Sequence, residues 1–137
     1  MRYLRFLLDG KKKTGVREGG KIRVLGDAAL ETLLADGVDL EAYAGGVAGG
    51  TLVTGADVTF LPVLEHPPKL LCVGLNYADH TRESKLEQPK YPTMFPRYDT
   101  SLTGHGQPIV RPRVSDSLDF EGEFAVILKS GGPHIRK

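Results

Sequence analysis

The sequence has no surplus of charge of either sign. Its 137 residues include 18 lysines and arginines and 17 acidic residues, which gives a net charge of +1. Proteins that attract nucleic acids or anionic membranes carry a clear basic excess. The composition therefore argues against both, and we expect neither a nucleic acid nor a membrane among the partners of this chain.

Cysteine is almost absent, and long hydrophobic runs are missing as well. The single cysteine, Cys72, cannot form a disulfide within the chain, which is typical of proteins in a reducing compartment. No apolar run approaches the roughly 20 residues of a membrane-spanning helix, and the apolar part of the N-terminus is too short for a signal peptide. We therefore expect a cytoplasmic protein.

The charges that are present are distributed unevenly. Residues 1–26 carry eight basic and two acidic residues, whereas residues 27–65 carry seven acidic residues and no basic one. The basic cluster can be interpreted as an anion-binding patch. Because the acidic segment compensates it, we expect its side chains to face solvent on short strands.

The first half of the chain has the pattern of short strands and turns. Strands are predicted at 3–8, through Val16 and at 22–25, and Asp9-Gly10 is a strong hairpin signal. Asp27 is predicted to cap a short helix whose leucines in 30–34 share one face.

Two further segments complete this half. The glycine-rich stretch 44–50 predicts a loop. Residues 58–64 have strand character, and Pro62 marks an edge strand or a bulge.

The hydrophobic pattern of the sequence changes after His66-Pro67-Pro68, where two prolines favour an extended connector. Residues 70–73 form a continuous apolar run, as in a strand buried on both faces. A short helix is predicted at 78–85, loops and short strands at 86–117, and the cleanest strand of the sequence at 120–128.

That last strand would place two carboxylates side by side. On a strand Glu121 and Glu123 share one face, with their Cα atoms about 7 Å apart. Adjacent carboxylates repel each other, and a divalent cation removes this repulsion; hard oxygen ligands suit magnesium, manganese or calcium better than zinc. The alternative is a solvated face of an antiparallel strand, which spacing alone does not exclude.

A second candidate site lies in the predicted helix. His80 and Glu83 are neighbours at i and i+3, and a carboxylate beside an imidazole can orient it as a general base. The alternative is an ordinary surface pair. Arg97 is a weaker candidate, able to bind a substrate carboxylate, and Cys72 is expected to be a small core residue.

Together these motifs resemble the fumarylacetoacetate hydrolase family. The resemblance is carried by Leu71-Cys72-Val73-Gly74-Leu75-Asn76-Tyr77-Ala78-Asp79-His80 with Glu83, and by Leu118-Asp119-Phe120-Glu121-Gly122-Glu123-Phe124. The stretches 92–95 and 104–110 and the N-terminal opening are similar to the family as well. Two motifs in the right order and at matching separation are far more specific than either alone.

The resemblance implies a mainly β fold with some α structure. A small N-terminal β-rich domain (1–65) would precede part of a mixed β-sandwich or β-roll catalytic domain (66–137). It also implies that the full-length protein is a homodimer.

The resemblance further implies a metal-dependent active site. Glu121 and Glu123 would hold Mg²⁺, with Mn²⁺ or Ca²⁺ as alternatives, and His80 would act as general base beside Glu83. The reaction would be hydrolysis of a C–C bond in a 2,4-diketo acid of the fumarylacetoacetate or acylpyruvate type, with Arg97 in contact with the substrate.

Two alternatives accompany this activity. Relatives of the family decarboxylate, hydrate or isomerise 2-oxo acids at the same site. In the family a third metal ligand and a catalytic lysine follow the two glutamates, and the sequence ends 14 residues after Glu123. We therefore expect an incomplete catalytic domain, inactive by itself, and the other alternative is a catalytically silent binding or interaction fragment.

Overall fold

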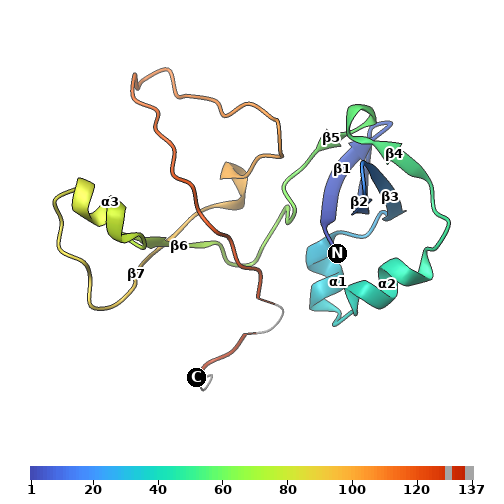
Figure 1. Cartoon of the computed structure of the whole chain (residues 1–137), viewed down its shortest axis with the longest axis horizontal. Coiled ribbons are helices and arrows are strands. Elements are labelled where there is room, and N and C mark those ends of the chain that lie inside the picture. The colour runs from blue at the N-terminus through green and yellow to red at the C-terminus, as the bar shows by residue number, and fades with distance from the viewer. Residues whose placement is uncertain (129–130, 135–137) are drawn as a thin grey trace. The chain divides into compact units, whose positions relative to one another are not determined.

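A computed structural model describes residues 1–128 and 131–134 of the chain (Figure 1). The fold is mostly β with few helices, which confirms the predicted class. The chain forms two compact units: Met1–Leu64 together with the described residues from Thr103 onward, and Glu65–Leu102. The predicted division into domains 1–65 and 66–137 stays a prediction. No helix in the described residues is long and apolar enough to cross a membrane.

The first unit is built on a five-stranded antiparallel sheet with the order β4-β3-β2-β1-β5. Its strands are β1 (Tyr3–Leu8), β2 (Lys11–Glu18), β3 (Lys21–Gly26), β4 (Leu52–Thr54) and β5 (Thr59–Phe60), and a single 3-10 turn, η1 (Gly55–Asp57), separates the last two. β5 lies at the edge of the sheet, as Pro62 predicted, but it is shorter than the predicted strand 58–64.

The hairpin between β1 and β2 has the predicted turn. Asp9 and Gly10 both adopt positive φ angles, 50° and 74°, which is the backbone of the tight turn that fits the strand twist. Further along β2 the register shifts between Thr14 and Gly15. A Cβ atom on Gly15 would lie 2.8 Å from the carbonyl oxygen of Arg23, so only glycine fits at this bulge.

Two short helices, α1 (Leu30–Ala35) and α2 (Leu40–Gly46), lie near each other at one end of these strands (Figure 1). The core joins α2 to the sheet through the buried residues Val16, Leu25 and Ala44. α2 was not expected, because the prediction of a loop at 44–50 rested on the local glycines. Packing of Ala44 against the sheet outweighs the low helix propensity of Gly45 and Gly46.

The predicted role of Asp27 is wrong. α1 begins after Ala29 and has no side-chain cap, and the Asp27 carboxylate instead lies 2.5 Å from Lys13 Nζ on β2. This hydrogen bond and the positive charge of Lys13 lower the pKa of Asp27 below its usual value. The Asp27 carboxylate therefore pairs with a residue distant in the sequence and does not cap the nearby helix.

The second unit is a two-stranded antiparallel sheet whose connecting segment contains a short helix. β6 (Leu71–Gly74) pairs antiparallel with β7 (Thr93–Pro96), from Leu71 opposite Pro96 to Gly74 opposite Thr93. Between the strands runs the helix α3 (Ala78–Glu83), shorter than the predicted 78–85, and after β7 comes a 3-10 turn, η2 (Asp99–Ser101). The unit therefore places α3 at the end of the ladder where β6 leaves it.

Residues 103–106 pack against the end of the first sheet. The imidazole of His105 makes an edge contact with Phe60, with ring centroids 5.7 Å apart. A Cβ atom on Gly104 would lie 1.9 Å from the carbonyl oxygen of Phe60, so the approach requires glycine.

The predicted strand at 120–128 is wrong for this structure, which has no regular secondary structure at those residues. A strand needs a neighbour to satisfy its N–H and C=O groups and to cover its apolar face. No strand among the described residues forms a ladder with this segment, and Phe120 and Phe124 are 88% and 91% exposed. The alternating pattern is present, but it has no sheet to join.

Candidate functional site

α3 carries the predicted catalytic pair, His80 and Glu83. The two residues lie three positions apart in the helix, and both side chains are exposed to solvent. The helix is compatible with its charges, because Asp79 lies in the first turn and His80 and Arg82 lie in the last. Their spacing on one helix is therefore as predicted, and their catalytic roles stay predictions.

Arg97 lies in the same unit but at the other end of the hairpin. It directly follows β7, and its backbone N–H donates to the carbonyl of Leu70 at 2.9 Å. The four-residue ladder between this end and the start of the α3 excursion is about 10 Å long. The backbone therefore does not place Arg97 beside the N-terminal end of α3, and its contact with substrate stays a prediction.

Glu121 and Glu123 lie in the extended segment that follows residue 103, and both are exposed. Their carboxylates are the donors that Mg²⁺ prefers. However, a hard cation needs several such donors in one place, and no group of three His, Cys, Asp or Glu side chains gathers anywhere in residues 1–128 or 131–134. The donor types suit the metal, but the described residues do not form its site.

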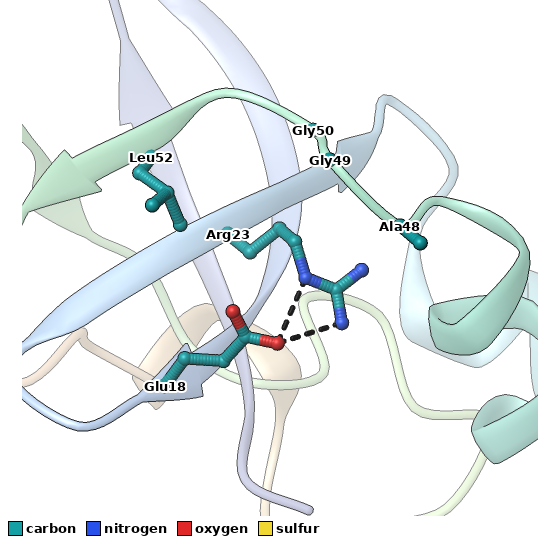
Figure 2. Close-up of a pocket in the computed structure, with 6 residues that line it drawn as sticks. All are labelled: Glu18, Arg23, Ala48, Gly49, Gly50 and Leu52. Carbon is teal, nitrogen blue, oxygen red and sulfur yellow. Dashed lines mark hydrogen bonds and ion pairs between the residues drawn. The ribbon is translucent and has the colours of Figure 1, made fainter.

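A hollow of about 360 Å³ opens in the first unit beside β2, β3 and the loop before β4 (Figure 2). Glu18 and Arg23 are its charged residues, and their side chains face each other in Figure 2. The Glu18 carboxylate accepts hydrogen bonds from Nε and Nη2 of Arg23, both at 2.8 Å. Nη1 of Arg23 donates to the carbonyls of Ala44 and Val47, at 2.6 and 2.8 Å.

These bonds make Arg23 a structural residue. Its charge is paired with Glu18, and it adds a charged donor to the two carbonyls at the C-terminal end of α2, which also accept from the backbone N–H groups of Val47 and Gly50. Little of the guanidinium remains to bind an anion, so the hollow has the chemistry of a helix clamp and not of a substrate site.

The expectation that the basic N-terminal cluster faces solvent is therefore wrong for two of its members. Arg5 and Arg23 are only 5% and 9% exposed. Nη1 of Arg5 donates to Thr14 Oγ1 at 3.2 Å and to the Asp27 carbonyl at 2.9 Å. Only knowledge of the strand pairing could have identified them, because their acceptors lie 5 to 24 residues away in the sequence.

A second contact that was not predicted from the sequence joins the two ends of the second unit. Nδ1 of His66, in the proline-rich connector, lies 2.7 Å from a carboxylate oxygen of Asp99 in η2. The hydrogen bond from His66 lowers the pKa of Asp99. The contact joins the two ends of Glu65–Leu102 and therefore closes the unit that contains α3.

Comparison with known proteins connects the second half of the chain to a family. A family profile described as fumarylacetoacetate (FAA) hydrolase C-terminal matches residues 69–137, half of the chain. The matched range contains all the predicted site residues: His80, Glu83, Arg97, Glu121 and Glu123.

Curated relatives match more than half of the chain. Over 85 residues, 62% of this chain, the sequence is 40% identical to the oxaloacetate tautomerase Fahd2a, mitochondrial, of Rattus norvegicus. It is 38% identical over 81 residues, 59% of the chain, to the oxaloacetate tautomerase FAHD2A, mitochondrial, of Homo sapiens. These matches cover 27% and 26% of the relatives, so the chain corresponds to about a quarter of their length.

Solved structures share the fold. A protein from Mycobacterium smegmatis aligns with a TM-score of 0.60 at 24% identity, over 82% of this chain and 41% of that one. The fumarylacetoacetate hydrolase of the psychrophilic Exiguobacterium antarcticum aligns with a TM-score of 0.50 at 28% identity, over 74% of this chain and 36% of that one. With the profile matching half of its length, the chain belongs to the fumarylacetoacetate hydrolase family.

Proposed function

We propose that this chain contributes the His80–Glu83 part of an active site that interconverts the keto and enol forms of a 2-oxo acid such as oxaloacetate. The observation that carries the proposal is the 40% identity to an oxaloacetate tautomerase over 85 residues. It favours the isomerase alternative among the 2-oxo acid reactions that the family resemblance implied.

The chemistry required is modest and suits the residues of α3. Enolisation removes a proton from C3 of the oxo acid and delivers one to the oxygen on C2, so no other bond is broken. An imidazole side chain can accept or donate a proton in either transfer close to neutral pH. In the proposal His80 moves the proton, and Glu83 on the same helix orients the ring.

We also propose Glu121 and Glu123 as ligands of a divalent cation, Mg²⁺ in the first place and Mn²⁺ or Ca²⁺ otherwise. Support comes from the hard donor type of the two carboxylates and from the family resemblance. The same resemblance supports Arg97 as a contact for a substrate carboxylate and a homodimer for the full-length protein. Cytoplasmic localisation rests on the lone cysteine and remains a proposal, while both relatives described above are named as mitochondrial.

Hydrolysis of a C–C bond in a 2,4-diketo acid is the second candidate. It is favoured by the 28% identity to the fumarylacetoacetate hydrolase of Exiguobacterium antarcticum. Both reactions begin from a 2-oxo acid and pass through an enolate, but hydrolysis also requires an attacking water and a leaving carbanion. The two candidates therefore differ in products and are separated by one assay.

The assay supplies the purified chain with Mg²⁺ and either oxaloacetate or acetylpyruvate. Enol absorbance reports tautomerisation, and release of acetate and pyruvate reports hydrolysis. For His80→Ala we expect the catalysed rate to fall by about 10²- to 10⁴-fold, and the matched control His134→Ala should keep it.

Metal binding is read out separately, as a shift of the unfolding temperature by Mg²⁺. Glu121→Ala and Glu123→Ala should abolish that shift, whereas Glu87→Ala should keep it. A His80→Ala variant as active as the wild type contradicts the role proposed for His80. A chain that turns over neither substrate contradicts turnover by these 137 residues alone and agrees with the expected inactivity of an incomplete domain. A chain inactive on both substrates is the result expected of the silent-fragment alternative.

A further inference from the structure

α3 is too short to be stable through its own backbone bonds. It has six residues, whereas isolated helices need about 12 to 15 to form in water. Its N-cap residue, Tyr77, makes no side-chain capping bond, and Thr81 is the one buried residue that the helix contains. Thr81 is therefore the side chain through which α3 contacts the interior of the unit.

Thr81 takes part in a hydrogen-bonded bridge with Gln88. The Thr81 residue is only 3% exposed, and its hydroxyl lies 3.0 Å from Gln88 Oε1 and 3.3 Å from the carbonyl of Tyr77. Nε2 of Gln88 donates to the carbonyl of Leu75 at 2.9 Å. Since that carbonyl can only accept, the orientation of the Gln88 amide follows, and its oxygen faces Thr81.

The same bridge spans both ends of the helix, where the backbone is strained. Leu75, before α3, and Lys85, after it, have φ angles of 53° and 56°, a region that favours glycine. Gln88 binds the carbonyl of Leu75 itself. On the other side, the N–H of Leu86 donates to the carbonyl of Thr81 at 3.2 Å and closes the turn through Lys85.

The geometry of a helix relates this bridge to the exposed pair. At 100° per residue, His80 and Glu83 lie about 60° apart around the helix axis, whereas Thr81 lies about 100° from His80 and 160° from Glu83. With Thr81 held inward, the other two side chains are directed outward together. A rotation of α3 would move both.

We propose that Thr81 and Gln88 are positioning residues, which fix the rotation and the ends of α3 and so hold His80 and Glu83 in place. The catalytic part of this inference rests on the proposed function. Neither residue is assigned any contact with substrate; both act through the helix.

Amide hydrogen exchange, measured by NMR on the full chain, tests the bridge without any activity. The reporters are the N–H groups of Ser84 and Leu86, which donate to the carbonyls of His80 and Thr81. Thr81→Val, which keeps the branched shape and removes the hydroxyl, and Gln88→Ala should each speed their exchange about three- to tenfold. Thr81→Ser, which keeps the hydroxyl, and the neighbouring control Glu87→Ala should leave it near the wild-type rate.

The fold of each variant is checked in the other unit. The Arg17 N–H, which donates to the carbonyl of Arg2, should exchange at the wild-type rate in all four. If Ser84 and Leu86 exchange at the wild-type rate in Thr81→Val and in Gln88→Ala, the bridge does not hold α3 and the inference is overturned.

Steady-state kinetics on oxaloacetate test the catalytic part. Thr81→Val and Gln88→Ala should lower kcat about three- to tenfold with KM unchanged, and Thr81→Ser should restore kcat. An unchanged kcat in variants whose α3 amides exchange faster overturns the positioning role. Wild-type protein without turnover contradicts turnover by the chain alone and overturns the catalytic part with it, while the exchange rates still decide whether the bridge holds the helix.

Discussion

α1 and α3 are helices of equal length that are held by different forces. Each has six residues, and neither has a side-chain N-cap. α1 buries two leucines, Leu30 and Leu33, within the first unit. α3 buries only Thr81, whose hydroxyl belongs to a hydrogen-bonded bridge.

The two kinds of contact differ in how much they stabilise the folded state. Burial of a leucine side chain stabilises a fold by about 1.5–3 kcal/mol, whereas a typical internal hydrogen bond contributes about 0.5–1.5 kcal/mol. α1 is therefore part of the core, and α3 is a weakly held element on a hairpin. Weakly held elements that display titratable side chains are where binding and catalysis are commonly found.

The largest effect is expected from Leu33→Ala in α1. Leu33 is 7% exposed, so its removal leaves a cavity and should lower the free energy of unfolding by about 2–4 kcal/mol. The matched control is Leu86→Ala, just after α3, where the side chain is 57% exposed and the loss should stay below about 1 kcal/mol. Urea denaturation of both variants measures the difference, and equal losses would contradict the comparison.

A smaller effect is expected where the segment after residue 103 touches the packed sheet. In Gly104→Ala the new methyl group would overlap the carbonyl of Phe60, and relief of the clash should cost about 1–3 kcal/mol. Gly122→Ala is the control, since a Cβ atom there meets nothing within 4 Å. The same denaturation experiment applies, and loss of the His105–Phe60 contact is visible in the NMR spectrum of the ring. A Gly104→Ala variant as stable as Gly122→Ala would show that the segment does not pack there.

The smallest effect is expected from acid at the base of the hairpin unit. The hydrogen bond from His66 lowers the pKa of Asp99, so its contribution to stability is complete above the unfolded value of about 3.8. That contribution is lost as the pH falls through the folded-state pKa. His66→Ala should raise the pKa of Asp99 towards its usual value.

Carboxylate NMR titration checks this outcome and contains its own control. Asp57 in the first unit also has a lowered pKa, caused by hydrogen bonds from the backbone and side chain of Thr54. It should titrate identically in the His66→Ala variant. A pKa of Asp99 that does not respond would mean that the contact with His66 is not what lowers it.

Local patterns predicted the elements that depend on neighbours in the sequence. The Asp9-Gly10 turn brings β1 and β2 together, and the leucine spacing of 30–34 gives α1. The apolar run 70–73 lies largely within β6, and the segment with His80 and Glu83 is helical. These features need only a few consecutive residues, because turn chemistry and helix periodicity act within one or two turns of chain. The prediction that the strand at 70–73 is buried on both faces is wrong, because Leu71 is 53% exposed and Cys72 is only half-buried.

Apart from the shorter bounds of β5 and α3, the errors involve partners far away in the sequence. α2 forms despite its glycines because Ala44 finds the sheet, Asp27 pairs with Lys13 and not with the helix end, and Arg23 is buried because it binds α2. Residues 120–128 have the pattern of a strand and no strand to pair with among the described residues. No local pattern specifies such partners.

The sequence by itself determined the family, the β-rich class and the spacing of His80 and Glu83, because motif order and residue type are properties of the chain alone. The tertiary structure decided which charges are buried, that the Asp27 carboxylate pairs with Lys13, and that Gln88 binds the carbonyl of Leu75 before α3. The physical reason is the distance along the sequence over which each interaction acts. Propensity acts between neighbours, whereas burial and hydrogen bonding depend on which distant groups the fold brings within about 3 Å of each other.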